Sequence, residues 1–543
     1  MPKQTVSKDF LFKLVCAAIF FGTGAYIFSP FVDYQMALSN GDHGLILYAS
    51  EAVSRGDQPY HDFHYFYGPL MPYYYSLFFK IFGTNIPSIL MGKLLLDILN
   101  GALIFLTLRM FIPSPLSWVA AIWFWVNQVE FFYTYNHVGI TTTSLAILYC
   151  LALYIRSQRM KFLYYGLLLV VIASFIKLNF GFCALAGLIL SVPFIDYFKR
   201  VDLLSSNKKL FYITAIFILP ALIILGNWLT VWGLPFYVIK QCFQYFGNDA
   251  PAAYYPSIID NIKNLGSSLI YLILSKWHSQ FFCIIIFALA LSNIHYIKQK
   301  KSTNDRFKDM FLLAGALILF MILYLHEYII SGIVFRSFYS IPFIFIFLFL
   351  IIGLFMHNTA RYVRIAVSSV ILFIALFQFS LRLDHIKMFL HPWHYLPQKN
   401  AKIFVGNSPR WVLTVHQTLD YLEKHLTKSE LFFALPYDPL YYFLADKRSP
   451  TRQLVFFHFT GIPEKQEREI INELENQHIN WIVVTNRIIS SDPGLGTFGV
   501  THCQLLNQYI NNHFEIQAQF GDWDIEPGWI GPHGVRILKR ISD

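Results

Sequence analysis

Residues 338–356 read FYSIPFIFIFLFLIIGLFM, a stretch that holds no charged side chain. A helix of about twenty apolar residues is long enough to cross the roughly 30 Å hydrocarbon layer of a bilayer. Further apolar runs recur near 11–30, 86–110, 115–131, 139–156, 161–177, 181–198, 209–231, 279–297, 309–326 and 363–382. The sequence therefore predicts an α-helical polytopic membrane protein with about eleven transmembrane helices.

The composition supports a membrane protein and argues against a nucleic-acid-binding one. Of the 543 residues, 56% are hydrophobic and only 14% are charged, whereas soluble domains carry about a quarter charged residues. The formal net charge of +10 would suit a nucleic-acid partner, but most lysines and arginines lie between the apolar runs. Cytoplasmic loops of membrane proteins carry such an excess, so we expect a bilayer and no nucleic acid among the partners.

The basic residues also predict the orientation of the spans. With the N-terminus inside, the connections that become cytoplasmic hold Arg109, Arg156, Arg159, Lys161, Lys199, Arg200, Lys208, Lys209, Lys298, Lys300, Lys301, Arg306, Lys308, Arg361 and Arg364. The outward connections hold far fewer, namely Arg55, Lys80, Lys177, Lys240, Lys263, Lys276 and Arg336. This asymmetry follows the positive-inside rule, and an odd number of spans then places the C-terminal tail outside.

One region leaves the span count open. Residues 263–277 could lie on the membrane surface as an amphipathic helix. They could instead form a further span, which would move the tail to the cytoplasm.

From about residue 384 the composition becomes that of a soluble α/β domain. Helices are predicted at 412–424 and 464–477, and strands at 479–485 (INWIVVT), 514–520 and 535–538. We therefore expect a transmembrane domain over residues 1–383 and a soluble periplasmic domain over residues 384–543.

The long outward segment after the first span, about residues 31–85, is rich in Tyr, Phe, His and Pro. Its central part, residues 40–83, reads NGDHGLILYASEAVSRGDQPYHDFHYFYGPLMPYYYSLFFKIFG. Asp42 lies directly before an amphipathic run. An acid at the membrane interface costs desolvation energy unless it has a partner or a role, which favours a functional carboxylate held by a surface-lying helix. A structural role as a helix cap is the alternative, and spacing alone does not choose between them.

The order of residues in this segment resembles the C-type (GT-C) glycosyltransferases. The nearest branch includes the bacterial protein mannosyltransferase-like and aminoarabinose transferase-like enzymes. The match runs through Asp42, Gly44, Ala49, Gly56, Pro59, Tyr60, Asp62, Phe63, Gly68, Pro69 and Gly83. Two later stretches also resemble the family, SFIKLNFG with Lys177 between two spans and VFRSFYSIP with Arg336 before a late span. The resemblance covers about residues 10–385.

The resemblance implies an inverting glycosyltransferase of a bacterial inner membrane. Such an enzyme moves a hexosyl or pentosyl group from a polyprenyl-phosphate carrier to a cell-envelope glycan or lipid acceptor on the outer face. Asp42 matches the position of the general base, and Arg336 and Lys177 match cations that bind the donor phosphate. For Lys177 the alternative is a side chain that merely extends to the membrane surface.

Other polar residues are candidates for lining the site, namely His43, Asp62, His64, Tyr67, His137 and Glu327. Many relatives carry Asp-Glu where this chain has Asp42-His43, so the resemblance does not imply how Asp42 is oriented. A divalent metal ion is a possible cofactor, because His and carboxylates are common ligands, and the candidate ligands are His43, His61, Asp62 and His64. Interfacial packing and hydrogen bonding are the alternative for these histidines.

Two other function classes remain open. A lipid-sugar flippase or transporter would predict repeated halves and polar groups at mid-membrane, whereas the polar groups here gather in the outward segments. A non-enzymatic envelope assembly protein would leave Asp42 and Arg336 without a chemical role.

Overall fold

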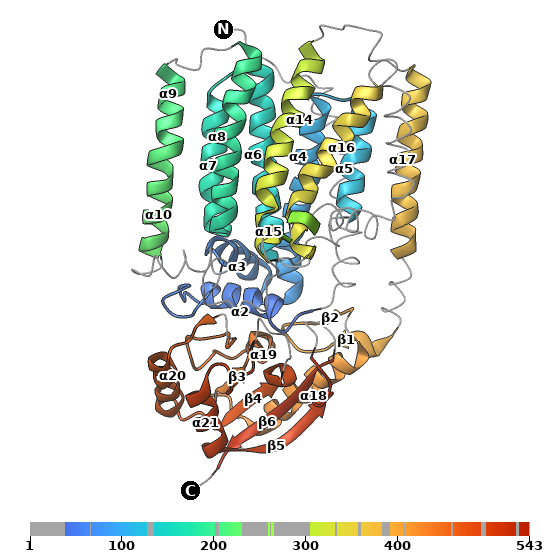
Figure 1. The fold of residues 1–543 in the computed structure, drawn as a ribbon. Helices are drawn as coiled ribbons and strands as arrows, with labels where there is room; N and C mark the ends of the chain where they lie inside the picture. Colours follow the sequence, from blue (N-terminus) through green and yellow to red (C-terminus); the bar gives the residue numbers. More distant parts are fainter. Residues whose placement is uncertain are drawn as a thin grey trace.

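The computed structural model describes residues 38–65, 67–127, 135–200, 206–230, 259–260, 262–264, 305–331, 334–356, 360–382, 391–406, 408–457, 460–489, 496–527 and 532–541. These residues form three tiers (Figure 1). Long helices run side by side in the first tier, two short helices lie across their ends in the second, and an α/β layer forms the third.

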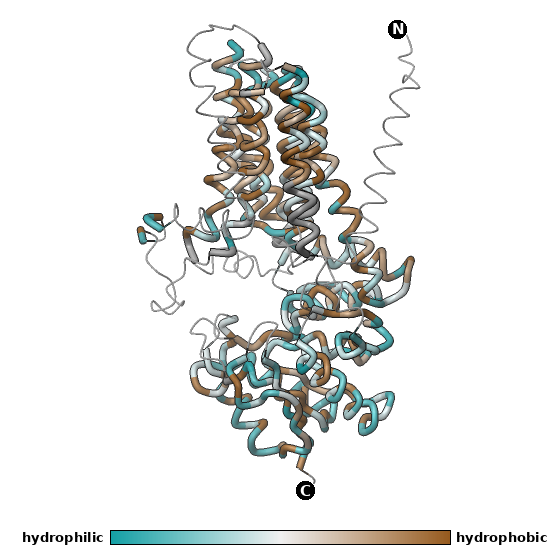
Figure 2. Tube along the Cα trace, turned by 90° about the vertical axis from the view of Figure 1, so that its right-hand side faces the viewer, coloured by the Kyte–Doolittle hydropathy of each residue, from teal (hydrophilic) through white to brown (hydrophobic). Residues whose placement is uncertain are grey.

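The first tier is the membrane part. In chain order it contains α4 (Ile86–Arg109), α5 (Ser114–Asn127), α6 (Tyr135–Ser157), α7 (Lys161–Ile176), α8 (Leu178–Lys199), α9 (Ser206–Ile213), the π-helix η2 (Thr214–Ile218), α10 (Leu219–Thr230), α14 (Asp305–Tyr324), α15 (His326–Ser331), the 3-10 helix η3 (Val334–Ser340), α16 (Ile341–Met356) and α17 (Arg361–Arg382). Apolar residues dominate this tier (Figure 2). Among the described residues, five stretches are long and apolar enough to cross a membrane, namely Ile86–Arg109, Asn136–Ser157, Leu178–Lys199, Ser206–Gly226 and Phe307–Ile329.

Helices lie at nine of the eleven predicted spans, of which α5, α7 and α16 are shorter than a full crossing. The predicted spans at 11–30 and 279–297, and most of the undecided stretch at 263–277, lie outside the described residues. The total of eleven therefore stays a prediction.

Buried ion pairs tie the helices together at one end of the tier. We call the helix ends beside the two short helices the domain end, and the opposite ends the far end. At the far end, Arg156 Nη1 lies 2.9 Å from Asp309 Oδ2, and Lys199 also pairs with Asp309. A second pair joins Lys208 to Asp196. A buried carboxylate needs such partners, and these contacts link α6, α8, α9 and α14.

The second tier consists of α2 (Asp42–Ser54) and α3 (Leu70–Phe82), which pack on each other. The sequence predicted that the helix after Asp42 lies at the membrane interface; α2 lies across the ends of the membrane helices (Figure 1), and its place relative to a bilayer stays a prediction. The residues of α2 from His43 to Val53 are all buried, because α3 packs on one side and α19 (Pro439–Leu444) of the third tier packs on another. A Cβ atom at Gly44 would lie 2.5 Å from the backbone nitrogen of Leu440, so only glycine permits this approach.

The third tier holds a four-stranded sheet in the order β3-β4-β6-β5. Strand β3 (Phe432–Leu435) runs parallel to β4 (Trp481–Thr485), and β6 (Gly534–Arg540) runs antiparallel to β4 and to β5 (Phe514–Gly521). The remaining elements are α18 (Pro409–His425), α19, α20 (Glu464–Asn476), α21 (Gln504–His513), a short β1–β2 pair (Tyr395–Leu396, Ile403–Phe404), and the 3-10 helices η5 (Pro392–His394) and η7 (Asn486–Ile489). The predicted helices at 412–424 and 464–477 and all three predicted strands are present within a few residues, whereas α19 and α21 were not predicted.

Candidate active site

Asp42 lies where the second and third tiers meet. It is the first residue of α2, whose N-cap position belongs to Gly41, and no side chain caps this helix. Asp42 Oδ1 instead accepts a hydrogen bond of 2.9 Å from the hydroxyl of Tyr437, which comes from the third tier. The carboxylate is only partly buried. The structure therefore contradicts the helix-cap alternative, and the catalytic role of the carboxylate stays a prediction.

His43 does not share the surroundings of Asp42. Its Nδ1 accepts a 2.9 Å hydrogen bond from the backbone of Ser39, whose hydroxyl accepts one of 3.2 Å from the backbone of Asp42. The His43 side chain is buried and lies within electrostatic range of His137, at the domain end of α6. The two hydrogen bonds of Ser39 therefore fix the turn in which the Asp42 and His43 side chains have different partners.

Lys177 occupies the break between α7 and α8. Its backbone is extended, with φ −155° and ψ 108°, so it ends one helix and starts the next. The ammonium group pairs with Glu327, donates a 3.1 Å hydrogen bond to the hydroxyl of Tyr339, and lies 4.9 Å from the ring centre of Phe180. A lysine held among aromatic faces and one carboxylate presents a fixed positive charge at the domain end.

Glu327 and Arg336 complete this charged group. Glu327, on α15, is buried and also accepts a 2.9 Å hydrogen bond from Asn179. Arg336, on η3, lies within electrostatic range of both Glu327 and His137. The His137 ring packs edge-on against Tyr339, with 4.9 Å between ring centres. The two predicted cations and two of the predicted lining residues therefore share one cluster.

Tyrosines connect Asp42 with that cluster. Tyr65 donates a 3.2 Å hydrogen bond to Asn136 beside His137, and its ring centre lies 5.9 Å from that of Tyr67. The ring centre of Tyr67 in turn lies 5.9 Å from the ammonium nitrogen of Lys177. Burial, together with the negative charge of Asp42, raises the pKa of Tyr65 above its usual value. The hydroxyl therefore keeps its proton and acts as a donor beside the site.

The remaining candidates lie elsewhere. Asp62 is exposed and closes its own turn by accepting from the backbone of Gln58 and from His61, both at 2.7 Å. His64 is held against the third tier, where its Nδ1 lies 2.5 Å from Gln453 Oε1. Burial lowers the pKa of His64 and so favours its neutral form.

These positions also bear on the proposed metal ligands. His61 and Asp62 bond to each other, but His43 bonds to Ser39 and His64 to Gln453, so the structure does not bring the four candidates into one cluster. Within the described ranges, no three His, Cys, Asp or Glu side chains are grouped so that they could hold a metal ion. The four candidate residues therefore do not form a metal site in the described part of the chain.

Tyr437, Tyr339 and Asn179 are the contributors that sequence reasoning missed. Asn179 and Tyr339 lie within the two stretches that resemble the GT-C family, so their neighbours gave a signal. Tyr437 gave none, because 395 residues separate it from Asp42 and its surroundings carry no motif.

The arrangement offers a partly exposed carboxylate and a cationic cluster with tyrosines between them, all at the domain end. Carboxylates in such positions can take up a proton, and fixed cations of low exposure can stabilise a developing anion.

Comparisons with known proteins show the fold. No protein-family profile matches the chain, and no curated protein matches it either. Two crystal structures of ArnT from Cupriavidus metallidurans do match. The apo structure is 10% identical, with 97% of this chain and 98% of that chain covered and a TM-score of 0.53. The structure bound to undecaprenyl phosphate is 12% identical, with 96% and 97% covered and a TM-score of 0.51. The resemblance to GT-C proteins is thus confirmed at the level of the fold, over nearly the whole chain.

Proposed function

We propose that this protein is an inverting glycosyltransferase that moves a sugar from a polyprenyl-phosphate carrier to a cell-envelope glycan or lipid acceptor. The single observation that carries the proposal is the placement of Asp42 at the same helix ends as the Lys177–Arg336 cluster. In this proposal the Asp42 carboxylate accepts a proton, and the Lys177–Arg336 cluster neutralises a phosphate. The fold supports it as well, since the chain has the fold of a protein crystallised with undecaprenyl phosphate. A buried phosphate site at the ends of membrane helices suits a donor whose lipid tail stays in the bilayer.

In the proposed reaction the acceptor hydroxyl gives its proton to the Asp42 carboxylate. The acceptor oxygen then forms a bond to the anomeric carbon, while the bond from that carbon to the phosphate oxygen breaks. The electron pair of the broken bond stays on the lipid phosphate, where Lys177 and Arg336 stabilise the added negative charge. A single displacement of this kind inverts the anomeric configuration.

The proposal includes an orientation. The far end carries the basic residues Arg156, Lys199 and Lys208, and Arg361 begins α17 there, as the positive-inside rule expects of a cytoplasmic face (Figure 1). The domain end and the α/β layer then face the periplasm of a bacterial inner membrane, with the N-terminus in the cytoplasm. The α/β layer covers the site from outside.

The test compares sugar transfer by Asp42→Asn with transfer by the wild type, in membranes supplied with radiolabelled polyprenyl-phosphate sugars. Asparagine keeps the shape and can still accept from Tyr437, but it cannot take up the proton. We expect kcat to fall by about 10²- to 10⁴-fold, the usual contribution of a general base. Asp62→Asn is the matched control, because Asp62 lies in the same segment but is exposed and bonded within its own turn.

Full transfer by Asp42→Asn would overturn the assignment of the base. Failure of the wild type to transfer from any carrier, combined with movement of labelled lipid across reconstituted vesicles, would identify a flippase instead.

A further inference from the structure

The contact between Asp42 and Tyr437 belongs to a larger junction between α2 and the third tier. The segment from Asn40 to Asp42 lies against residues 437–440 of that tier. The backbone oxygen of Asn40 accepts a 3.3 Å hydrogen bond from the backbone nitrogen of Leu440. The side-chain amide of Asn40 donates a 2.9 Å hydrogen bond to Asp438 Oδ1. Backbone and side-chain bonds together fix the register of the two segments.

Gly41 sets the distance between them. A Cβ atom at this position would lie 2.4 Å from Cδ1 of the Tyr437 ring, closer than any real contact. The ring therefore packs directly on the backbone that precedes Asp42. Its hydroxyl reaches the carboxylate because no side chain stands between them.

Buried polar groups hold the other side of the junction. Asp438 Oδ2 accepts a 2.7 Å hydrogen bond from Thr485, at the end of β4. His533 Nε2 lies 3.0 Å from the Asn40 amide nitrogen and 2.8 Å from the Tyr441 hydroxyl oxygen. Burial lowers the pKa of His533 to about 3, so the ring is neutral, and its Nε2 lies within hydrogen-bonding distance of both groups. Hydrogen bonds to Thr485 and His533 thus hold residues 437–441 against the sheet.

We propose that Tyr437 is a positioning residue for the catalytic base. By donating to Oδ1 it fixes the rotation of the Asp42 carboxyl group, and it leaves Oδ2 to meet the acceptor hydroxyl. The inference rests on the proposed role of Asp42. With this role for Tyr437, the α/β layer contributes a residue to the active site in addition to any part it has in binding the acceptor.

The state of the tyrosine suits this role. Burial and the charge of Asp42 raise the pKa of Tyr437 well above its usual value. The hydroxyl therefore remains a donor throughout the pH range in which Asp42 must be charged. Its ring also packs edge-on against Phe457, with 5.3 Å between ring centres, which restricts its motion.

The test is Tyr437→Phe, which removes the hydroxyl and keeps the ring. A hydrogen bond to a charged group that orients the reacting oxygen is worth about a 10- to 100-fold change in rate. We expect kcat to fall by that factor while the KM for the donor changes by less than about twofold, because the phosphate cluster is untouched.

Tyr442→Phe is the matched control. Tyr442 lies on α19, the helix that follows Tyr437, and is also buried, but its hydroxyl accepts from the backbone of Ala434 at 2.7 Å, inside the third tier. Loss of this bond affects stability alone, so kcat per folded molecule should be unchanged. Gly41→Ala gives a second test, because its methyl group displaces the Tyr437 ring without removing the hydroxyl, and the same selective fall in kcat is expected.

Unchanged kcat in Tyr437→Phe, or equal losses in both tyrosine variants, would refute the positioning role. If Asp42→Asn is inactive while Tyr437→Phe is normal, the proposed function stands and only this inference fails. If Asp42→Asn is active, the proposed function itself fails.

Discussion

Lys177 is the residue whose surroundings argue most directly against its alternative role as an interfacial anchor. A lysine that only anchors a helix at the interface extends its ammonium into water. The ammonium of Lys177 instead turns inward to Glu327 and Tyr339. Holding an ammonium there before a phosphate arrives reduces the entropy that binding would cost.

Replacing Lys177 by Met should weaken donor binding. Removal of one charge-assisted contact to phosphate costs about 1.5 to 3 kcal/mol, which corresponds to roughly a 10- to 100-fold rise in the KM for the polyprenyl-phosphate sugar. Initial rates measured against donor concentration report this change. Lys161→Met, at the far end of the same helix, is the control and should leave the KM unchanged. An equal rise in both variants would mean that the helix, not the charge, had been damaged.

Single positions were predictable from sequence only where local chemistry marked them. Asp42, Lys177, Arg336 and Glu327 each interrupt an apolar or aromatic setting, which made them candidates, although their roles stay predictions. Tyr437 is one aromatic residue among many, and only the tertiary contact distinguishes it. Asp62 was a candidate by the same local reasoning, and in the structure it bonds to Gln58 and His61 within its own turn.

Among the elements, the reversal between α7 and α8 supports the cationic cluster. The two helices meet without a loop, and a Cβ atom at Gly181 would lie 2.7 Å from Cα of Ser174. The segment before α3 docks on the same reversal, where Gly68 donates a 3.0 Å hydrogen bond to the backbone oxygen of Ile176. The docking places Tyr67 beside Lys177.

Gly68→Val tests this docking. A Cβ atom at Gly68 would lie 2.1 Å from the backbone oxygen of Phe175, and backbone cannot yield as a side chain can. We expect the segment to lift from α7, with a loss of about 1 to 3 kcal/mol of stability and a higher donor KM. Thermal unfolding in detergent and transfer kinetics measure the two effects. In Gly166→Ala the nearest neighbour of the methyl group is the movable end of Leu188, at 3.2 Å, and Cys150 Cβ lies at an ordinary contact distance of 4.0 Å. This control should remain near wild type.

The spacing of apolar residues along the sequence predicted most of the helices and strands, but it did not predict every contact between them. Spans and strands were predictable because burial in lipid or in a sheet imposes long apolar runs. The burial of α2 was not predictable, because its second face is polar. There Glu51 pairs with Arg55 at 3.2 Å, and the Ser50 hydroxyl donates to the backbone oxygen of Ile46 at 2.6 Å. These polar residues interrupt the apolar pattern that would have indicated burial.

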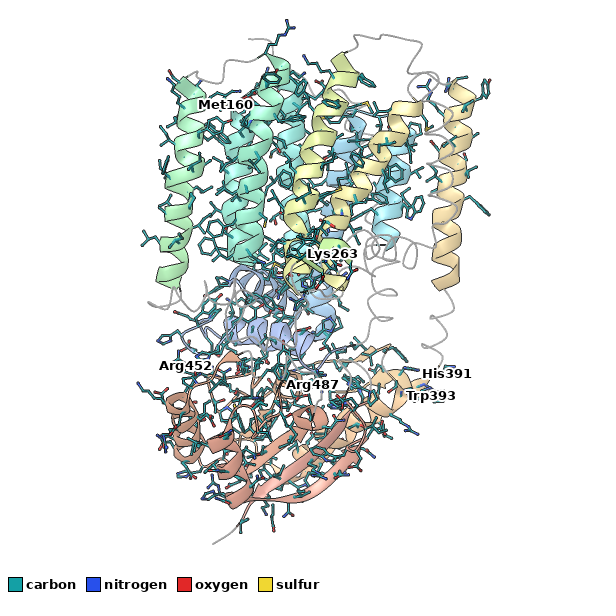
Figure 3. All side chains as sticks on the ribbon, viewed as in Figure 1. Met160, Lys263, His391, Trp393, Arg452 and Arg487 are labelled. Atoms are coloured by element: carbon teal, nitrogen blue, oxygen red, sulfur yellow. The ribbon has the colours of Figure 1, made fainter. Side chains whose placement is uncertain are left out.

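At the scale of the whole molecule, a cluster of polar side chains joins the tiers. Asn40, Asp438 and His533 are all buried there, and Arg487, which lies within electrostatic range of Asp438 and His533, is at the edge of the α/β layer that faces α2 (Figure 3). A buried polar junction holds its geometry only while every member keeps its protonation state.

Acidification should therefore weaken this junction. The pKa of His533 is about 3 in the folded protein against 6.5 when exposed, so the unfolded chain binds a proton first. The contribution of neutral His533 to the free energy of unfolding is complete above about pH 6.5 and is lost as the pH falls towards 3. The free energy of unfolding falls by no more than about 1.4 kcal/mol per pH unit over this range. Melting temperatures measured between pH 7 and pH 4.5 should fall less steeply in His533→Gln than in wild type. Parallel curves would contradict the prediction, and His513→Gln, which changes an exposed ring, should follow wild type.

The contact between Asn40 and His533 joins positions 493 residues apart, and this separation has a consequence for biosynthesis. A nascent chain exposes Asp42 soon after its first helices insert, long before the strand that follows His533 has been made. In the proposed orientation, the α/β layer must cross the membrane and fold before the Tyr437 hydroxyl can donate to the carboxylate. We therefore expect a partly exported chain to bind carrier lipid but to transfer sugar slowly, so the order of synthesis itself delays activity until assembly is complete.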